Sequence, residues 1–444
     1  MPIKLVEGLR ADSKSRLAFV GAGGKTTAMF SLARQMSGLV ICLNTAHLAV
    51  EQAKLADHHV VVTEEEDLRR AFGDVTSGVL LFSGPANDRG RLEGLPLETA
   101  EKIKTLADFH NLPVLIEADG ARLLALKAPA PHEPPIPPWV NQVVNMVGLS
   151  VLGKPLNSEY VFRPEIFSEL SGAGMGTTIH ADHLVRYLQN PLGGLKNIPA
   201  EARKTLFANQ LDECVVPKSE LIATLATLSP AFDCILAGSL QNLAAQIEWR
   251  GEPIAGIILA AGGAKRMGKV KQLLQWHGQP LVRHVAETAI QAGLTPVVVV
   301  TGAAASEVES ALTGLPVTIV HNQYWETGQA SSVRAGVNAL PNNSGGVVFL
   351  LSDMPQIPVD LIRTELELHQ NETSAIICPR VKGQRGNPVL FDRQTFPALM
   401  QLKGDSGGRK LFDQFPIRWL EWDDPGILLD IDTPQDYQDL LKRS

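Results

Sequence analysis

The sequence predicts an α/β protein of two domains, each built on a mainly parallel sheet. Its 444 residues exceed what one hydrophobic core usually organises, which favours two domains. Short apolar runs of strand length alternate with segments of helical period in both halves, and this alternation is typical of parallel sheets. In each half the first strand opens directly into a glycine-rich loop, so both domains are expected to begin with a strand and a glycine loop.

The first half begins with an expected strand at residues 17–20, the loop GAGGKTT at residues 21–27 and a helix at residues 28–35. Another helix is expected at residues 97–109. The remaining strands are expected at residues 39–43, 59–62, 79–83, 113–118 and 142–148. Strands and helices alternate, which predicts a mainly parallel sheet in this half.

Three further segments complete the first half. The run KAPAPHEPPIPP at residues 127–138 has too many prolines for a helix or a central strand, so a surface loop or hinge is expected. Residues 163–212 are expected to be helical and rich in loops, and a last helix is expected at residues 240–249. The sequence RGEP follows at residues 250–253, which predicts domains of residues 1–250 and 251–444.

The second half repeats the alternation of strands and helices. Strands are expected at residues 255–261, 296–301, 317–320, 346–351, 374–378 and 427–429. Helices are expected at residues 281–292, 331–340, 359–369 and 435–442, the last with Thr433 as its cap and Pro434 at its first position. The pattern predicts an open, doubly wound sheet of the Rossmann-like kind.

The overall composition excludes several classes of protein. A formal net charge of −7 argues against general affinity for nucleic acid or an anionic membrane, because both need a basic face. The apolar runs have strand length and are too short to cross a bilayer, and the first residues lack the apolar core of a signal peptide. The four cysteines are isolated, as expected for a reduced, cytoplasmic protein.

Charged residues that could bind a ligand follow the predicted strands of the second half. Ligands of open α/β sheets lie beyond the carboxyl ends of the strands. The glycine loop after the first strand carries Arg266, Lys269 and Lys271, which suits the phosphates of a nucleoside triphosphate. Asp353 follows another strand, and Asp430 and Asp432 follow a third. Converging carboxylates near a triphosphate are typical of a magnesium site.

Five motifs follow one another in this half: LAAGGAKRMGKVKQLL at 259–274, LLSDMP at 350–355, RGNPVLF at 385–391, KGDSGGR at 403–409 and DIDTP at 430–434. Together they resemble the molybdenum cofactor cytidylyltransferase (MocA-type) family of nucleotidyltransferases. The resemblance covers residues 254–444 and implies transfer of CMP from CTP to molybdopterin, with release of pyrophosphate. It implies that the triphosphate is held by Ala261, Gly262, Gly263, Arg266 and Lys271. Asp353 and Asp432 would hold Mg²⁺, and Lys271, Arg266 and Asp353 would be catalytic.

Further residues are carried over as contacts of the second substrate. Asn387, Asp405 and Arg409 are substrate-side residues by the resemblance alone. Ser332 and Arg334 contact a nucleotide or pterin phosphate in one interpretation, and form a helix cap and a solvated arginine in the other. Val270 stands where sugar nucleotidyltransferases typically have proline, and LAAG with MGKVK favours the cytidylyl type over the guanylyl type.

The glycine loop of the first half suggests a second nucleotide site. Gly23, Gly24, Lys25 and Thr26 lie as in a P-loop, although Phe19 occupies the position of the first glycine, so the loop is a variant. The expected strand at 113–118 leads to Glu117 and Asp119, which could supply the metal-side carboxylate, and Asp119 is taken as the metal ligand. We therefore predict a P-loop-like domain that binds ATP or GTP, against the alternative of a purely structural strand-to-helix turn.

The first half also contains four distinctive motifs: GAGGKTT, IEADGARLLALKAPAPHEPPIP at 116–137, VGLSVLGKPL at 147–156 and FRPE at 162–165. With them it resembles the selenium-dependent hydroxylase accessory (YqeC-type) family over about residues 5–245. Residues 43–47 depart from the family, which tends to have a threonine run there. The resemblance implies an accessory role beside a molybdenum hydroxylase client.

The leading hypothesis is a cytoplasmic, bifunctional maturation protein for molybdenum hydroxylases. It combines a Mg²⁺-dependent CTP:molybdopterin cytidylyltransferase with an NTP-binding accessory domain, and it requires no nucleic acid or membrane. Two alternatives stay open. One is a nucleotidyltransferase for another phosphorylated small molecule, and the other is a non-catalytic chaperone that inserts the cofactor.

Overall fold

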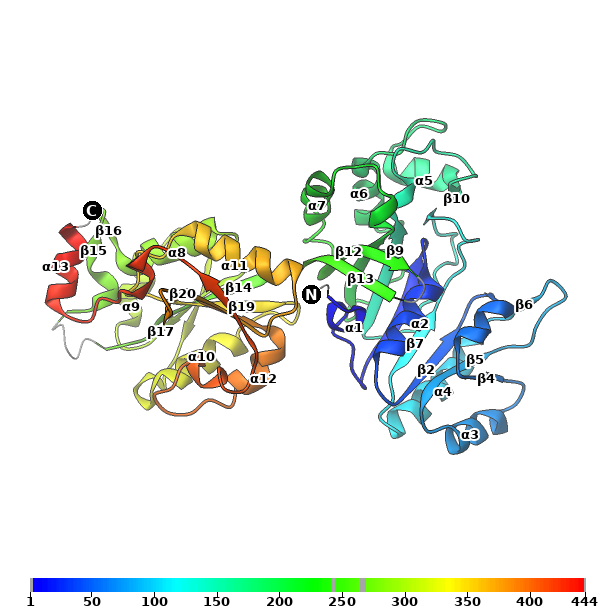
Figure 1. Ribbon diagram of the computed structural model, residues 1–444, viewed down its shortest axis with the longest axis horizontal. Coiled ribbons are helices and arrows are strands. Elements are labelled where there is room, and N and C mark those ends of the chain that lie inside the picture. Colours follow the sequence, from blue (N-terminus) through cyan, green and yellow to red (C-terminus); the bar gives the residue numbers. More distant parts are fainter. Residues whose placement is uncertain (1–2, 242–243, 264–268, 443–444) are drawn as a thin grey trace. The chain divides into compact units, whose positions relative to one another are not determined.

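The computed structural model describes residues 3–241, 244–263 and 269–442. The chain divides into two compact units, Met1–Gly251 and Glu252–Ser444, which are treated separately below. Each unit has its own sheet with helices on both faces (Figure 1), so the predicted α/β class is confirmed. Among the described helices, none is both long and apolar enough to cross a bilayer.

The first unit contains a nine-stranded sheet in the order β13-β12-β11-β9-β1-β7-β2-β5-β4. Its strands are β1 (Arg16–Gly21), β2 (Leu39–Asn44), β4 (His58–Val61), β5 (Gly78–Ser83), β7 (Val114–Glu117), β9 (Gln142–Gly148), β11 (Arg203–Asn209), β12 (Cys234–Gln241) and β13 (Ala244–Gly251). Its helices are α1 (Leu5–Gly8), α2 (Lys25–Gln35), α3 (Glu65–Asp74), α4 (Leu97–Phe109), α5 (Pro164–Ser171), α6 (Ala181–Gln189) and α7 (Lys218–Ala226). The pairings are parallel except that of β12 with β13.

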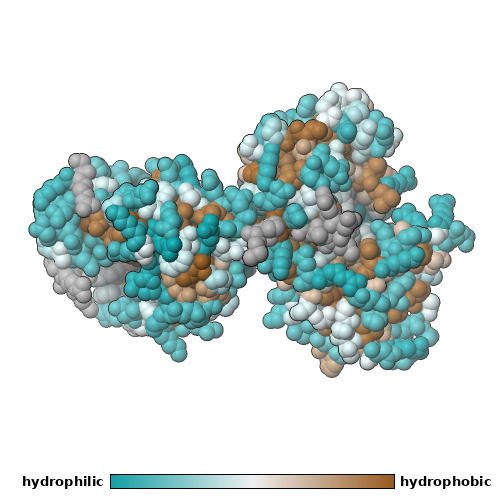
Figure 2. All heavy atoms as spheres, in the orientation of Figure 1, coloured by the Kyte–Doolittle hydropathy of each residue, from teal (hydrophilic) through white to brown (hydrophobic). Residues whose placement is uncertain are grey.

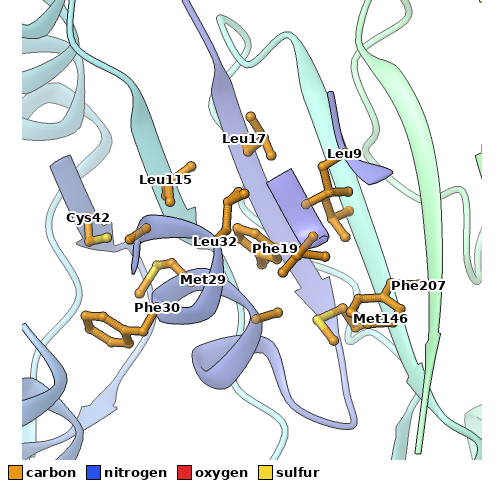
Figure 3. Packing of buried hydrophobic residues seen from close by; sticks show 14 of the residues in the cluster. Leu9, Leu17, Phe19, Met29, Phe30, Leu32, Cys42, Leu115, Met146 and Phe207 are labelled. Carbon is orange, nitrogen blue, oxygen red and sulfur yellow. The ribbon is translucent and has the colours of Figure 1, made fainter. Parts of the chain in front are cut away.

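Helix α2 is held against this sheet by a buried apolar cluster. Met29, Phe30 and Leu32 of α2 pack with Phe19 of β1 and Met146 of β9 (Figure 3). Successive residues of β1 belong to different clusters, since Leu17 and Phe19 lie in this one and Ala18 and Val20 in the cluster on the opposite face. A strand buried on both faces reads as a continuous apolar run, which is why β1 could be predicted.

The helix expected at residues 240–249 is wrong, because β12 and β13 form an antiparallel pair there. The register shifts between Ala237 and Gly238, whose partners are Trp249 and Ile247. This bulge places Ile247 and Trp249 in core clusters on opposite faces of the sheet, so the usual alternation of a strand is lost from the sequence. Strand β11 was also missed, inside the segment expected to be helical.

The second unit contains an eight-stranded sheet in the order β18-β17-β14-β19-β22-β20-β21, with β23 beside β20. Its strands are β14 (Ile254–Ala260), β17 (Val297–Thr301), β18 (Val317–His321), β19 (Gly346–Leu351), β20 (Ile376–Val381), β21 (Gln384–Arg385), β22 (Val389–Asp392) and β23 (Ile417–Glu421). Strands β18, β17, β14 and β19 are parallel, whereas β22 is antiparallel to both β19 and β20. The sheet is therefore mixed rather than wholly parallel.

The helices of this unit cover both faces of its sheet. They are α8 (Leu281–Gln291), α9 (Ala305–Ala311), α10 (Gln329–Asn338), α11 (Val359–Asn371), α12 (Phe396–Leu399) and α13 (Pro434–Lys442). Helices α8, α9 and α11 share one buried cluster with β14, and α10 and α12 share the cluster on the other face. On the visible face of each unit, hydrophilic side chains surround smaller apolar areas (Figure 2).

The strand expected at residues 427–429 is also wrong. A 3₁₀ turn, η8 (Pro425–Leu428), occupies this segment, and the Asp424 side chain accepts a hydrogen bond from the Gly426 amide at 2.8 Å. Proline at the first position and a capping aspartate favour a helical turn over a strand. Asp430 and Asp432 therefore follow a turn, and the final strand of the sheet is β23, which was not predicted.

Candidate functional site

Lys271 and two predicted carboxylates meet beyond the end of strand β14. Lys271 begins the short turn η4 (Lys271–Leu273), and Asp353 follows β19, the parallel neighbour of β14. The Lys271 ammonium contacts Asp432 Oδ1 and lies 3.9 Å from Asp353 Oδ2. Residues far apart in the sequence thus converge at the strand ends, as the topology of open α/β sheets predicts.

The electrostatic surroundings of Asp353 are unusual for a carboxylate. Burial raises the pKa of Asp353 to about 6, although Lys271 lowers it in part. The negative charges of Asp430 and Asp432 act in the same direction as burial and raise the pKa further. Asp353 therefore changes its charge close to neutral pH, and a nearby cation favours the charged form.

The glycine loop after β14 is held by residues that the sequence did not reveal. The Gln272 amide donates hydrogen bonds to the carbonyl oxygens of Ala260, at 3.2 Å, and Gly262, at 2.9 Å. A Cβ atom on Gly263 would lie 3.2 Å from the ring of Trp325. Gln272 directly follows Lys271, and that adjacency was the one available signal. Arg266 lies outside the described residues.

Two adjoining cavities lie beside this loop. The first, of about 530 Å³, is lined by Ala261, Gly262, Gly263, Lys271, Gln272, Trp325, Ser332 and Asp353 among others. The second, of about 460 Å³, includes Asn387, Arg409, Arg385, Lys410, Phe349, Phe391 and Phe412. Leu259, Gln329, Leu351 and Asp405 line both cavities, so the two adjoin along these residues. Together they offer one polar and one aromatic, basic compartment.

The predicted substrate residues differ in where they lie. Ser332 lines the first cavity and accepts a hydrogen bond from Asn322 at 3.0 Å, while Asn387 and Arg409 line the second. Asp405 lines both cavities. Arg334 instead donates a hydrogen bond to the Leu402 carbonyl oxygen, and it is not among the described residues that line either cavity.

In the first unit, the loop between β1 and α2 is shaped by glycine. Gly21, Gly23 and Gly24 have φ angles of 85°, 79° and 118°, a region that side chains disfavour. A Cβ atom on Gly23 would lie 2.4 Å from the Gly148 amide nitrogen, so only glycine fits there. Gly24 precedes α2, which begins at Lys25, earlier than the expected residue 28.

Lys25 and Thr26, the first residues of α2, each contact an acidic residue that follows or ends β7. The Thr26 hydroxyl donates a hydrogen bond to Glu117 Oε2 at 2.7 Å. The Lys25 ammonium donates to the Gly21 carbonyl oxygen at 2.7 Å and lies 3.4 Å from Asp119 Oδ1. Burial raises the pKa of Glu117, and the charge of Lys25 opposes that change.

Asp119 belongs to a chain of alternating charges that is buried at its Asp119 and Lys127 end. It lies 2.7 Å from Lys127, which lies 2.9 Å from Glu133, which in turn pairs with Arg163 at 2.7 Å. Burial alone would raise the pKa of Glu133, but hydrogen bonds from Arg163 and Lys127 outweigh it and hold the pKa at about 2. The chain ties the proline-rich segment to the glycine loop, because Asp119 also accepts from the Gly21 amide at 3.2 Å.

A cavity of about 770 Å³ opens at the start of α2. It is lined by Gly23, Gly24, Lys25, Thr26, Glu117, His47, Arg89, Arg91, Arg122 and Gln210 among others. Asp119 is not among the described residues that line it. Within residues 3–241, 244–263 and 269–442, no group of three or more His, Cys, Asp or Glu side chains is arranged to hold a metal ion.

Comparison with known proteins assigns each half to a family. The family model of the YqeC protein matches residues 17–165, and that of the MobA-like NTP transferase domain matches residues 256–418. An uncharacterized protein YqeC of Escherichia coli (strain K12) is 32% identical over 232 residues, which are 50% of this chain and 88% of that protein. A nicotine blue oxidoreductase of Paenarthrobacter nicotinovorans is 32% identical over 198 residues, 42% of this chain and 96% of that protein.

The chain belongs to the YqeC family in its first half and to the MobA-like NTP transferases in its second.

Both predicted family resemblances are confirmed, and the MobA-like half makes the protein a nucleotidyltransferase. A molybdenum cofactor cytidylyltransferase of Escherichia coli (strain K12) is 28% identical over 183 residues, 41% of this chain and 92% of that protein. The MobA-like match contains Lys271, Asp353 and both cavities. The YqeC match contains the glycine loop, Glu117 and the buried charge chain through Glu133 to Arg163.

Proposed function

We propose that the MobA-like half transfers CMP from CTP to molybdopterin and releases pyrophosphate. The observation that carries this proposal is the position of Lys271 between Asp353 and Asp432, beside a glycine loop and two adjoining cavities. The relative named molybdenum cofactor cytidylyltransferase supports the choice of substrates. In this proposal CTP occupies the cavity lined by the glycine loop, and the pterin occupies the basic, aromatic one.

The residues present fit a magnesium ion. Asp353 and Asp432 offer carboxylate oxygens, which are the ligands that Mg²⁺ prefers, and Mg²⁺ bound through substrate phosphates needs only one or two of them. When bound, Mg²⁺ supplies positive charge to the phosphate oxygens. Lys271 then supplies a second positive charge in the same cavity. Gly262 and Gly263 also line this cavity, and as glycines they have no side chains that would keep phosphates away from their backbone amides.

The proposed reaction needs no covalent intermediate on the protein. A phosphate oxygen of molybdopterin attacks the α-phosphorus of CTP, and the bond from that phosphorus to the oxygen bridging to the β-phosphate breaks. The charge that develops on pyrophosphate lies near Lys271 in this arrangement. Arg385, Arg409 and Lys410 line the second cavity and are placed to hold the attacking phosphate.

The proposal is tested by incubating the protein with Mg²⁺, molybdopterin and CTP, GTP or ATP, and measuring pyrophosphate and dinucleotide. We expect product with CTP and little with the other nucleotides. Product with CTP and another phosphorylated acceptor, but none with molybdopterin, would favour the alternative transferase. Binding of cofactor and hydroxylase without pyrophosphate would favour a chaperone. Because one relative is named an oxidoreductase, NAD(P)H oxidation is followed in the same mixtures and is expected to be absent.

The pKa of Asp353 predicts how metal affinity changes with pH. Its pKa is raised to about 6, chiefly by burial, so the carboxyl is charged only above that pH. Protons compete with the metal below it, and affinity should therefore rise through this pH and then level off. We expect Mn²⁺ to bind about tenfold more weakly at about pH 5 than at about pH 7. Free Mn²⁺ measured by electron paramagnetic resonance checks this, and an Asp353→Asn variant should lack the step.

A further inference from the structure

We propose that the YqeC half binds a nucleoside triphosphate with a divalent cation, and that Thr26 and Glu117, rather than Asp119, form the cation side of this site. The proposal does not depend on cytidylyl transfer in the other half. It begins from the cavity of about 770 Å³ at the start of α2, whose lining combines a glycine loop, a buried lysine, a buried hydroxyl–carboxylate pair and three arginines.

The glycine loop and α2 provide the phosphate side. The first amides of an α-helix have no partner within the helix, and no side chain caps α2 at Gly24 in the described structure. Lys25 is only 4% exposed, yet it lines the cavity. A buried ammonium beside free helix amides attracts an anion, and phosphate is the anion that such loops hold. Because α2 is 11 residues long, its aligned peptide dipoles add up to a partial positive charge at its N-terminus.

Thr26 and Glu117 provide the cation side. Glu117 is only 7% exposed, yet it lines the cavity. Its carboxylate accepts a hydrogen bond from the Thr26 hydroxyl. A hydroxyl and a carboxylate in contact at the edge of a phosphate site fit Mg²⁺, which takes such oxygen ligands together with phosphate oxygens. The ion would also neutralise a carboxylate that burial otherwise disfavours.

Asp119 is occupied by other contacts. Lys127 lies 2.7 Å from it, Lys25 lies 3.4 Å from it, and the Gly21 amide donates to it. Lys127 and the Gly21 amide both engage Oδ2, and Asp119 is not among the described residues that line the cavity, so Asp119 anchors the loop and Lys25. The sequence pattern offered both Glu117 and Asp119 and the choice fell on Asp119, whereas the geometry points to Glu117.

The size and charge of the cavity favour a nucleotide over inorganic phosphate. Its volume of about 770 Å³ is that of sites for whole small molecules, not for a single anion. Arg89, Arg91 and Arg122 line it, whereas few acidic residues do. This excess of positive charge suits the several negative charges of a triphosphate. Arg122 and Leu123 have positive φ angles of 52° and 62°. Residues with strained backbone of this kind are found most often at ligand sites.

The test measures binding of ATPγS and GTPγS, each with Mg²⁺, to the full-length protein by equilibrium dialysis. Lys271→Ala serves as the background, because it weakens the nucleotide site of the other half. We expect the remaining binding to fall about tenfold to a hundredfold when Lys25→Ala is added. Unchanged binding after Lys25→Ala, or no binding of either nucleotide, overturns the proposal. CTP-dependent transfer measured on Lys25→Ala alone should equal that of the wild type, which separates the two halves.

Matched variants test the cation side. Thr26→Ser keeps the hydroxyl and should bind as the background does, whereas Thr26→Val and Glu117→Gln should lose the gain in affinity that Mg²⁺ gives. Asp119→Asn should weaken binding with and without Mg²⁺ alike. If Asp119→Asn removes the Mg²⁺ dependence and Glu117→Gln keeps it, the assignment of Glu117 is wrong. Circular dichroism confirms that each variant is folded.

Discussion

Asp353→Asn is expected to lower the rate of cytidylyl transfer by about a hundredfold to a thousandfold. The substitution keeps the shape of the side chain but removes the charge that lies 3.9 Å from Lys271 and that would hold Mg²⁺. The loss acts on the reaction step, so it should appear in kcat at saturating CTP, measured as pyrophosphate release. If the chain is an enzyme, binding of a hydroxylase client should be unaffected.

Asp430→Asn is the matched control for this prediction. Asp430 is exposed and raises the pKa of Asp353 through its charge alone. Its removal should change the rate only a few-fold, about what a single solvated charge contributes. Equal losses in the two variants would show that overall negative charge, and not the position of Asp353, governs the reaction. A wild-type rate in Asp353→Asn would remove Asp353 from the proposed site.

Lys127→Met is expected to destabilise the YqeC half by about 3–5 kcal/mol, because it removes the positive charge that lies between the Asp119 and Glu133 carboxylates. The Lys127 side chain is 1% exposed and pairs with Asp119 and Glu133, whose side chains are 2% and 16% exposed. The Asp119 side chain is too deeply buried for water to replace the lost charge, so its share of the cost is not recovered. Urea unfolding of the full-length protein, followed by circular dichroism, should show an earlier transition.

Lys218→Met supplies the control for burial. Lys218 pairs with Glu248 at 2.8 Å, but the two side chains are 48% and 39% exposed. An exposed pair of this kind contributes less than about 1 kcal/mol, so the transition should hardly move. A similar shift in both variants would mean that the buried charge chain is no more important than a surface ion pair.

Much of the candidate site could be predicted because it follows one topological rule. Lys271 and Asp353 each come after a strand that is an unbroken apolar run, and parallel neighbours end at the same edge. The glycine loop at Gly21 was predicted for the same reason. Asp432 was found through its motif, although the strand expected before it is a 3₁₀ turn.

The remainder depends on contacts that sequence spacing does not encode. Gln272 and Trp325 shape the glycine loop through packing, and nothing local distinguishes them from surface residues. Asp119 and Glu117 are two residues apart in the same strand-end motif, so only the position of Lys127 decides which of them joins the chain of charges. The bulge between Ala237 and Gly238 similarly hid the last strand pair of the first unit.

The wall shared by the two cavities of the MobA-like half bears on product release. Leu259, Gln329, Leu351 and Asp405 line both, so a dinucleotide made from both occupants would touch both compartments at once. While one half of such a molecule stays bound, it keeps the other half at a high effective concentration near its own compartment. The dinucleotide therefore dissociates only when both halves are unbound at the same time. Turnover would then be limited by departure of the dinucleotide, and an acceptor that takes it directly from the protein would speed every cycle.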